Sequence, residues 1–306
     1  MTGMLRVSKY RALVALAIAY SASTACHQTP PSDHADHAAA PSESEHVMPG
    51  YQDAYLPPDA TRAHDKLAKS PRHGEWVVIA AGPNDSVRAW VVYPQRSTKA
   101  PVVVVVHEIF GLSTWVRAVT DQVAAGGFIA IAPDLLTSKH IPGSPDSVNA
   151  DSAVAAIRTL NPQDVQRELL AAANYGMALP AAVPRYGIVG FCWGGAVSFA
   201  HATYSPTVGA AVVFYGVSPD LLSLGKVRAP VLGLYGGDDA RVDATIPPAD
   251  SALTAMGRTY KPIIYAGAGH AFLRNQSGQD GANLTATRQA WPAMIGWFRD
   301  NLEIQH

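Results

Sequence analysis

The architecture of this chain is most readily inferred from residues 190–195, Gly190-Phe191-Cys192-Trp193-Gly194-Gly195. This segment overlaps the end of 185–191, which has the composition of a buried strand, and leads into 194–203, which has the pattern of a helix. A nucleophile between closely spaced glycines, at a sharp turn from strand to helix, is the G-x-S-x-G pattern with Cys in place of Ser. A buried structural thiol is the simpler alternative, but the strand–turn–helix context favours a nucleophile at Cys192.

Segments typical of strands and helices alternate on both sides of this turn. The clearest strand is 101–106, where five consecutive valines are typical of a strand buried on both faces. The other predicted strands are 87–93, 128–132, 185–191, 208–215, 230–235 and 260–265, and the predicted helices are 115–125, 162–177, 194–203, 249–256 and 285–301. The alternation predicts an α/β fold, with a mostly parallel central sheet and helices on both faces. Segment 136–161 is predicted to be an irregular insertion over the carboxyl ends of the strands, where sites form in such sheets.

Candidate partners for the thiol follow two later strands, in the order acid and then histidine. Asp238 and Asp239 come after strand 230–235, and either carboxylate could orient a catalytic imidazole. His270 follows the last predicted strand, on a glycine-rich loop. A histidine there is placed to take the proton of the thiol and later to protonate the leaving group.

The loop His107-Glu108-Ile109-Phe110-Gly111, directly after the valine strand, is the fourth element. We predict that the backbone N–H groups of Ile109 and Trp193 form an oxyanion hole, since these positions supply the donors in this arrangement. The start of the helix after Cys192 is expected to lower the pKa of the thiol. Glu108 is expected to raise that pKa unless its carboxylate pairs with another group.

Composition describes a folded chain without a charged face. The chain has 306 residues, 48% of them hydrophobic and 15% charged, and its formal net charge is -1. This is enough apolar material for a sizeable core. Because there is no excess of basic residues, nothing indicates a nucleic-acid partner.

The N-terminal segment has the pattern of an export signal. Basic residues precede the short apolar run 12–19, and small residues follow it, so we predict a signal peptide over 1–26. Its end, Ser23-Thr24-Ala25-Cys26, resembles a bacterial lipobox, which implies lipidation of Cys26. Residues 27–50 are predicted to be a flexible polar tether, and 51–306 the folded domain. The protein is therefore expected to be exported, as a periplasmic or membrane-anchored lipoprotein.

Taken together, these motifs resemble the dienelactone hydrolase family (carboxymethylenebutenolidase-like) of the α/β-hydrolase superfamily. The resemblance extends from about Trp76 to the C-terminus. The matching segments are His107-Glu108-Ile109-Phe110-Gly111, Trp115-Val116-Arg117, Ala132-Pro133-Asp134-Leu135, Gly190-Phe191-Cys192-Trp193-Gly194-Gly195, Tyr215-Gly216, Gly236-Gly237-Asp238-Asp239-Ala240-Arg241-Val242 and Gly269-His270-Ala271-Phe272.

The resemblance implies a role for each site residue. The catalytic triad would be Cys192, Asp239 and His270, with Asp239 favoured over Asp238 by the family's spacing. Glu108 would pair with the resting thiol and move when substrate binds. The substrate would contact Arg274, which would grip a carboxylate, and Tyr215.

The predicted activity is hydrolysis of a small-molecule ester or lactone, which requires no metal and no cofactor. The substrate could carry a carboxylate. A general carboxylesterase or thioesterase on the same fold is one alternative, and a catalytically silent binding lipoprotein is another. Contact with a membrane is expected only through the N-terminal lipid anchor.

Overall fold

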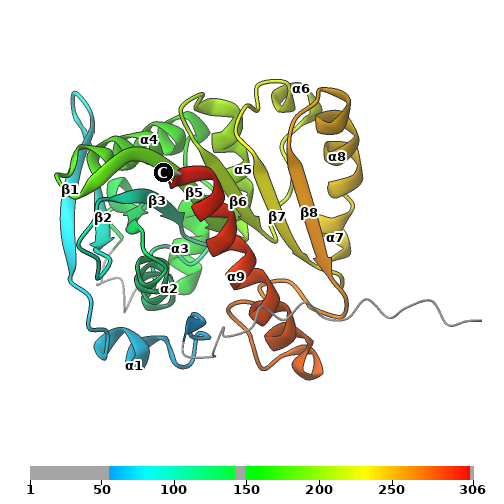
Figure 1. The fold of residues 1–306 in the computed structure, drawn as a ribbon, viewed down its shortest axis with the longest axis horizontal. Coiled ribbons are helices and arrows are strands. Elements are labelled where there is room, and N and C mark those ends of the chain that lie inside the picture. Colours follow the sequence, from blue (N-terminus) through cyan, green and yellow to red (C-terminus); the bar gives the residue numbers. More distant parts are fainter. Residues whose placement is uncertain (1–54, 142–148, 304–306) are drawn as a thin grey trace, which may run out of the picture. The chain divides into compact units, whose positions relative to one another are not determined.

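Eight strands form one sheet in the order β1-β2-β4-β3-β5-β6-β7-β8 in the described part of the chain (Figure 1). β2 pairs antiparallel with both β1 and β4, and the other neighbouring strands are parallel. The strands are β1 (Gly74–Gly82), β2 (Asp85–Val92), β3 (Ala100–Val106), β4 (Ile129–Asp134), β5 (Ala182–Phe191), β6 (Ala210–Phe214), β7 (Val231–Gly236) and β8 (Tyr260–Tyr265). The mostly parallel sheet that the sequence predicts is therefore present.

Most of the helices lie between strands, while one precedes the first strand and one follows the last. They are α1 (Ala63–Ala68), α2 (Thr114–Ala125), α3 (Ala150–Ile157), α4 (Pro162–Ala178), α5 (Trp193–Tyr204), α6 (Leu221–Leu224), α7 (Ala240–Asp243), α8 (Ile246–Ala255) and α9 (Ala282–Leu302), with short 3-10 turns at Thr137–Lys139 and Gln279–Gly281. Figure 1 shows α9 crossing the sheet, where it contacts β5, β6 and β7.

The computed structural model describes residues 55–141 and 149–303, all of them within the unit 47–306. The predicted signal peptide 1–26, the tether 27–50 and lipidation at Cys26 lie outside the described residues and stay predictions. No helix of the described residues is long and apolar enough to cross a membrane.

The valine strand explains how both faces of the sheet are covered. All residues of β3 are buried, and successive side chains of a strand point to opposite faces. Val103 and Val105 belong to a core shared with α2 and α9. Val102, Val104 and Val106 belong to a second core, shared with α4, α5 and α8. Helices on both faces, as predicted, cover the central strands of the sheet and leave the ends of the strands for the site.

The prediction for segment 136–161 is wrong in part. It contains α3, whose N-cap is Asn149, with a side chain that accepts a hydrogen bond from the backbone N–H of Ser152. Ala153 and Ile157, four residues apart on this helix, are buried against Leu136. The high content of Ser, Pro and Asp concealed a short amphipathic helix with a regular cap. Residues 142–148 of the segment lie outside the described residues.

A buried histidine away from the strand ends makes stability depend on pH. The Nδ1 atom of His201 lies 2.7 Å from the amide oxygen of Gln166, and Nε2 lies 3.0 Å from the hydroxyl of Tyr186. Nδ1 therefore carries the proton, and Nε2 accepts from the tyrosine. Burial lowers the pKa of His201 to about 4.

We expect His201 to reduce the free energy of unfolding in acid. The unfolded state takes up a proton below about pH 6.5, whereas the folded state does so only near pH 4. Between these values the stability should fall by about 1.4 kcal/mol per pH unit, about 3 kcal/mol in all. Urea unfolding of the wild type and His201→Gln across this range isolates the effect, because other groups titrate in both proteins. A difference in stability that does not change with pH would contradict the prediction.

Candidate active site

The backbone at Cys192 makes a sharp turn between β5 and α5. Its φ of 56° and ψ of -115° are strained for a residue with a side chain. A Cβ atom at Gly190 would lie 1.9 Å from the carbonyl oxygen of Gly194, and one at Gly194 would lie 2.3 Å from the carbonyl oxygen of His107. Only glycine fits at these two positions, so the glycines of the motif allow β5, α5 and the end of β3 to meet beneath the thiol.

Three predicted residues lie in one hydrogen-bonded line. The Nε2 atom of His270 lies 3.1 Å from Sγ of Cys192. The Nδ1 atom of His270 is hydrogen-bonded to Oδ2 of Asp239. These side chains follow β8, β5 and β7 respectively, so the carboxyl ends of parallel strands bring them together. Because a carboxylate only accepts, Nδ1 carries the proton and Nε2 is free to accept one from the thiol.

Asp239, and not its neighbour, reaches the imidazole. The backbone N–H of Asp238 donates to the carbonyl oxygen of Ala268 at 2.9 Å, which joins the loop after β7 to the loop that carries His270. With this bond in place, Asp238 is exposed to solvent and Asp239 is buried. Of the two aspartates that the sequence offers, Asp239 is therefore the one in contact with His270, and its role as the triad acid stays a prediction.

The thiol of Cys192 has a raised pKa, contrary to the expectation from the helix N-terminus. Burial is the largest cause, and the nearby charge of Glu108 raises the pKa further. A hydrogen bond from the backbone N–H of Trp193 lowers it, as expected, but does not outweigh burial. The raised pKa favours the neutral thiol, which would lose its proton as it attacks. His270 is the adjacent base.

The two predicted oxyanion donors lie on segments that meet at the thiol. The N–H of Trp193 points to the sulfur, and Ile109 follows the end of β3. Their side chains both pack on the apolar cluster of Leu136, Ala153 and Ile157. Three residues of the predicted insertion, Leu136, Ala153 and Ile157, therefore lie against the residues of the candidate oxyanion hole.

Glu108 is paired with Arg274 in this structure. The carboxylate is buried and accepts a hydrogen bond from Nη1 of Arg274. Burial raises the pKa of Glu108 to about 7, although the guanidinium opposes this shift. The guanidinium also lies over the ring of Phe110, 5.0 Å from its centroid. Contact between Glu108 and the resting thiol, which the resemblance implies, stays a prediction.

Tyr215 is fully buried beside the base. Its ring lies edge-on to the ring of His270, with centroids 5.2 Å apart. Its φ is 41°, so the backbone turns sharply after β6. In the described residues its hydroxyl has no hydrogen-bond partner. The structure therefore places Tyr215 against His270, and its contact with substrate stays a prediction.

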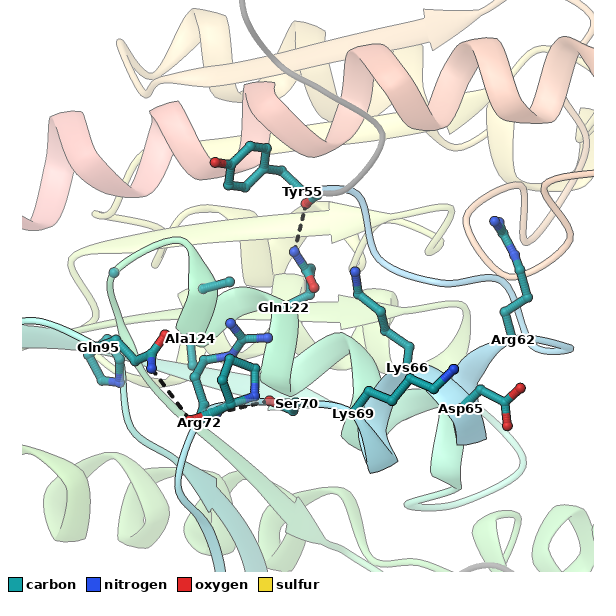
Figure 2. Close-up of a pocket in the computed structure, with 14 residues that line it drawn as sticks. Tyr55, Arg62, Asp65, Lys66, Lys69, Ser70, Arg72, Gln95, Gln122 and Ala124 are labelled. Carbon is teal, nitrogen blue, oxygen red and sulfur yellow. Dashed lines mark hydrogen bonds between the residues drawn. The ribbon is translucent and has the colours of Figure 1, made fainter.

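Two cavities lie outside the line of hydrogen bonds. The larger, of about 700 Å³, has a basic rim around Gln122, whose amide donates to the carbonyl oxygen of Tyr55 (Figure 2). The rim includes Arg62, Lys66, Lys69 and Arg72. The second, of about 370 Å³, borders the loop after β3 at Phe110 and Gly111, opposite Leu136 and Ile141. None of the predicted site residues lines either cavity.

Among the described residues, no group of three or more His, Cys, Asp or Glu is placed to hold a metal ion.

The sheet order, the turn at Cys192 and the loops that carry an acid and a histidine define an α/β-hydrolase. Residues 87–302 match the model of the "Dienelactone hydrolase family". The chain belongs to this family, and it is a hydrolase that acts on a lactone or ester.

Curated relatives and a solved structure agree with this assignment. A "Putative carboxymethylenebutenolidase" of Salmonella typhimurium is 31% identical over 227 residues, which cover 70% of this chain and 83% of that protein. A protein of the same name from Yersinia pestis is 31% identical over 257 residues, covering 78% and 94%. The structure of a "Putative Dienelactone Hydrolase" from Klebsiella pneumoniae superposes with a TM-score of 0.66 at 27% identity, covering 74% of this chain and 98% of that one.

His107 lies at the site but belongs to none of the roles predicted from the sequence. The side chain is fully buried, next to Glu108 and against the ring of Trp193. A signal was available, because a histidine that directly follows a buried strand and precedes a candidate oxyanion loop is well placed to order that loop.

Proposed function

We propose that this hydrolase works through a covalent thioester on Cys192, with His270 as the base and Asp239 as the residue that orients it. The observation that carries the proposal is the unbroken line from Sγ through the imidazole to the buried carboxylate. A nucleophile, a base within hydrogen-bond reach and a third group that orients the base are the features of covalent catalysis.

The proposed reaction begins with attack of Sγ on the carbonyl carbon as the thiol proton passes to Nε2 of His270. The carbonyl oxygen gains the negative charge, which the N–H groups of Trp193 and Ile109 would stabilise. The tetrahedral intermediate expels the alkoxide or enolate, which takes the proton from His270. Water then gives a proton to His270 and attacks the thioester, and the carboxylic acid leaves as Sγ recovers its proton.

Substrate recognition is proposed to involve Arg274. Its side chain is 24% exposed, so a substrate carboxylate could reach the guanidinium and take the place of Glu108. Arginine binds carboxylates with good geometry. Glu108 would then be released from Arg274 and would move as substrate binds, and a movement of Glu108 on binding is what the family resemblance implies. The ring of Tyr215 lies edge-on to the ring of His270 and would limit how the imidazole can rotate.

A lactone is the substrate class that we favour over a simple ester, because the curated relatives carry the name carboxymethylenebutenolidase. A thiol nucleophile also suits activated acyl groups such as enol lactones, because the enolate is a good leaving group. General carboxylesterase activity is the competing possibility on the same site.

The substrate profile of the purified protein tests this proposal. We expect turnover of both p-nitrophenyl acetate and a dienelactone, with a kcat/KM at least about tenfold higher for the dienelactone. A tenfold ratio corresponds to roughly 1.4 kcal/mol of additional transition-state binding. Turnover of the acetate ester alone would favour a general esterase. Turnover of neither would contradict the proposed function.

A further inference from the structure

His107 holds the peptide that carries one of the two proposed oxyanion donors. Its Nδ1 atom lies 2.8 Å from the carbonyl oxygen of Glu108. Since a carbonyl oxygen can only accept, Nδ1 carries the proton and donates it. The backbone N–H of Gly111 donates to the same oxygen at 3.2 Å. The carbonyl of Glu108 is thus fixed by two donors, one from a side chain and one from the backbone.

Fixing this carbonyl also fixes the N–H of Ile109. The two groups belong to one peptide unit, and the peptide bonds of the described residues are trans. In a trans peptide the C=O and the following N–H point in opposite directions. With the oxygen of Glu108 turned to the imidazole of His107, the N–H of Ile109 is directed away from it. Without the hydrogen bond from His107, the peptide between Glu108 and Ile109 would be freer to rotate, because it lies in a loop after a strand.

The same residue contacts the segment that carries the second donor. The ring of His107 stacks on the ring of Trp193, with centroids 5.5 Å apart and planes inclined by 22°. The carbonyl oxygen of His107 lies against Gly194, so close that a Cβ there would be at 2.3 Å. One buried residue therefore touches both halves of the candidate oxyanion hole.

The imidazole of His107 is suited to an orienting role and not to proton transfer. It is fully buried, and in the described residues its Nε2 has no hydrogen-bond partner. Burial lowers the pKa of His107, which favours the neutral ring. The ring thus keeps one proton, on the nitrogen that faces the carbonyl of Glu108.

We propose that His107 is a positioning residue of the oxyanion hole, which aims the N–H of Ile109 by holding the carbonyl of Glu108. The proposal rests on the proposed function, since it assigns a role toward the thioester chemistry of Cys192. It concerns stabilisation of the oxyanion, and not the nucleophile or the base.

Two substitutions separate the hydrogen bond from the packing. His107→Phe keeps a ring that can stack on Trp193 and removes the N–H donor. His107→Asn keeps an N–H at the same number of bonds from the backbone and removes the ring. Two rates are measured for each full-length variant: acylation, from the burst of p-nitrophenol, and alkylation of Cys192 by iodoacetamide. Alkylation reports on the thiol and its base without forming an oxyanion.

The expected result is a selective loss in His107→Phe. Its acylation rate should fall about 10- to 100-fold. Removal of an oxyanion donor lowers kcat by about 10²- to 10³-fold, and a misdirected donor loses a large part of that rate enhancement. Its alkylation rate should remain at the wild-type value, and His107→Asn should retain acylation to within about threefold. Wild-type acylation in His107→Phe would overturn the proposal, as would parallel loss of acylation and alkylation.

Two controls keep the test decisive. If His107→Phe does not fold, His107→Leu takes its place. Independently, ¹⁵N NMR of the wild type determines which ring nitrogen of His107 is protonated, and His107→Asn is used to assign the signal. A proton on Nε2 and none on Nδ1 would overturn the proposal. Wild-type turnover by Cys192→Ala would instead refute the proposed function itself.

Discussion

Replacement of Cys192 by alanine is expected to lower kcat for p-nitrophenyl acetate by at least about 10⁴-fold, the scale of loss when a covalent nucleophile is removed. The substitution deletes only the sulfur that faces His270 at 3.1 Å. The backbone turn is maintained by glycines at Gly190 and Gly194, so the fold should persist. Initial rates of p-nitrophenol release, corrected for the uncatalysed reaction, measure the loss.

Cys192→Ser is the matched variant, because it keeps the shape of the side chain and changes only the nucleophilic atom. It should fold like the wild type and retain a fraction of the activity, since the hydroxyl can still donate to His270. Far-UV circular dichroism and the thermal midpoint confirm that both variants are folded. Turnover by Cys192→Ala within tenfold of the wild type would show that another group attacks the substrate.

Asp239→Asn is expected to lower kcat/KM by about 10²- to 10⁴-fold, because removal of the carboxylate that orients a catalytic imidazole disturbs its tautomer. The buried carboxylate accepts from Nδ1 of His270. An asparagine at this position can present its NH₂ group there, which would favour the proton on Nε2 and leave no base for the thiol. The pH dependence of kcat/KM and the rate of alkylation of Cys192 should both change.

The neighbouring residue provides the control for this prediction. Asp238 has the same charge and is exposed, so Asp238→Asn should change kcat/KM by less than about twofold, as is usual for surface positions away from a site. If Asp238→Asn lost activity while Asp239→Asn kept the wild-type kcat/KM, Asp238 would be the acid instead of Asp239.

Most of the architecture follows from local patterns. The run of valines in 102–106 predicts a buried strand, and its alternate side chains fill the cores on the two faces of the sheet. The turn at Cys192 is recognisable from the glycines around it, and the order of the segments predicts that Asp239 and His270 reach the same edge of the sheet. Helix α3 was missed because a polar segment surrounds its short apolar stripe.

Features that depend on packing could not be obtained from the sequence. Burial is the largest cause of the raised pKa of the Cys192 thiol. The pattern of residues indicates the helix that lowers this pKa and the carboxylate of Glu108 that raises it, but not the burial of the sulfur. The pair of Glu108 and Arg274 joins residues 166 positions apart, and either partner alone has several plausible neighbours. The choice between Asp238 and Asp239 depends on the hydrogen bond to Ala268, which no local pattern specifies.

Mass spectrometry of protein quenched in acid during turnover of p-nitrophenyl acetate tests the thioester most directly. We expect one acetyl group on the peptide that contains Cys192, formed during the burst, lost as the substrate is consumed and missing from Cys192→Ala. Turnover that proceeds with no adduct, or with the acetyl group on another residue, would contradict it.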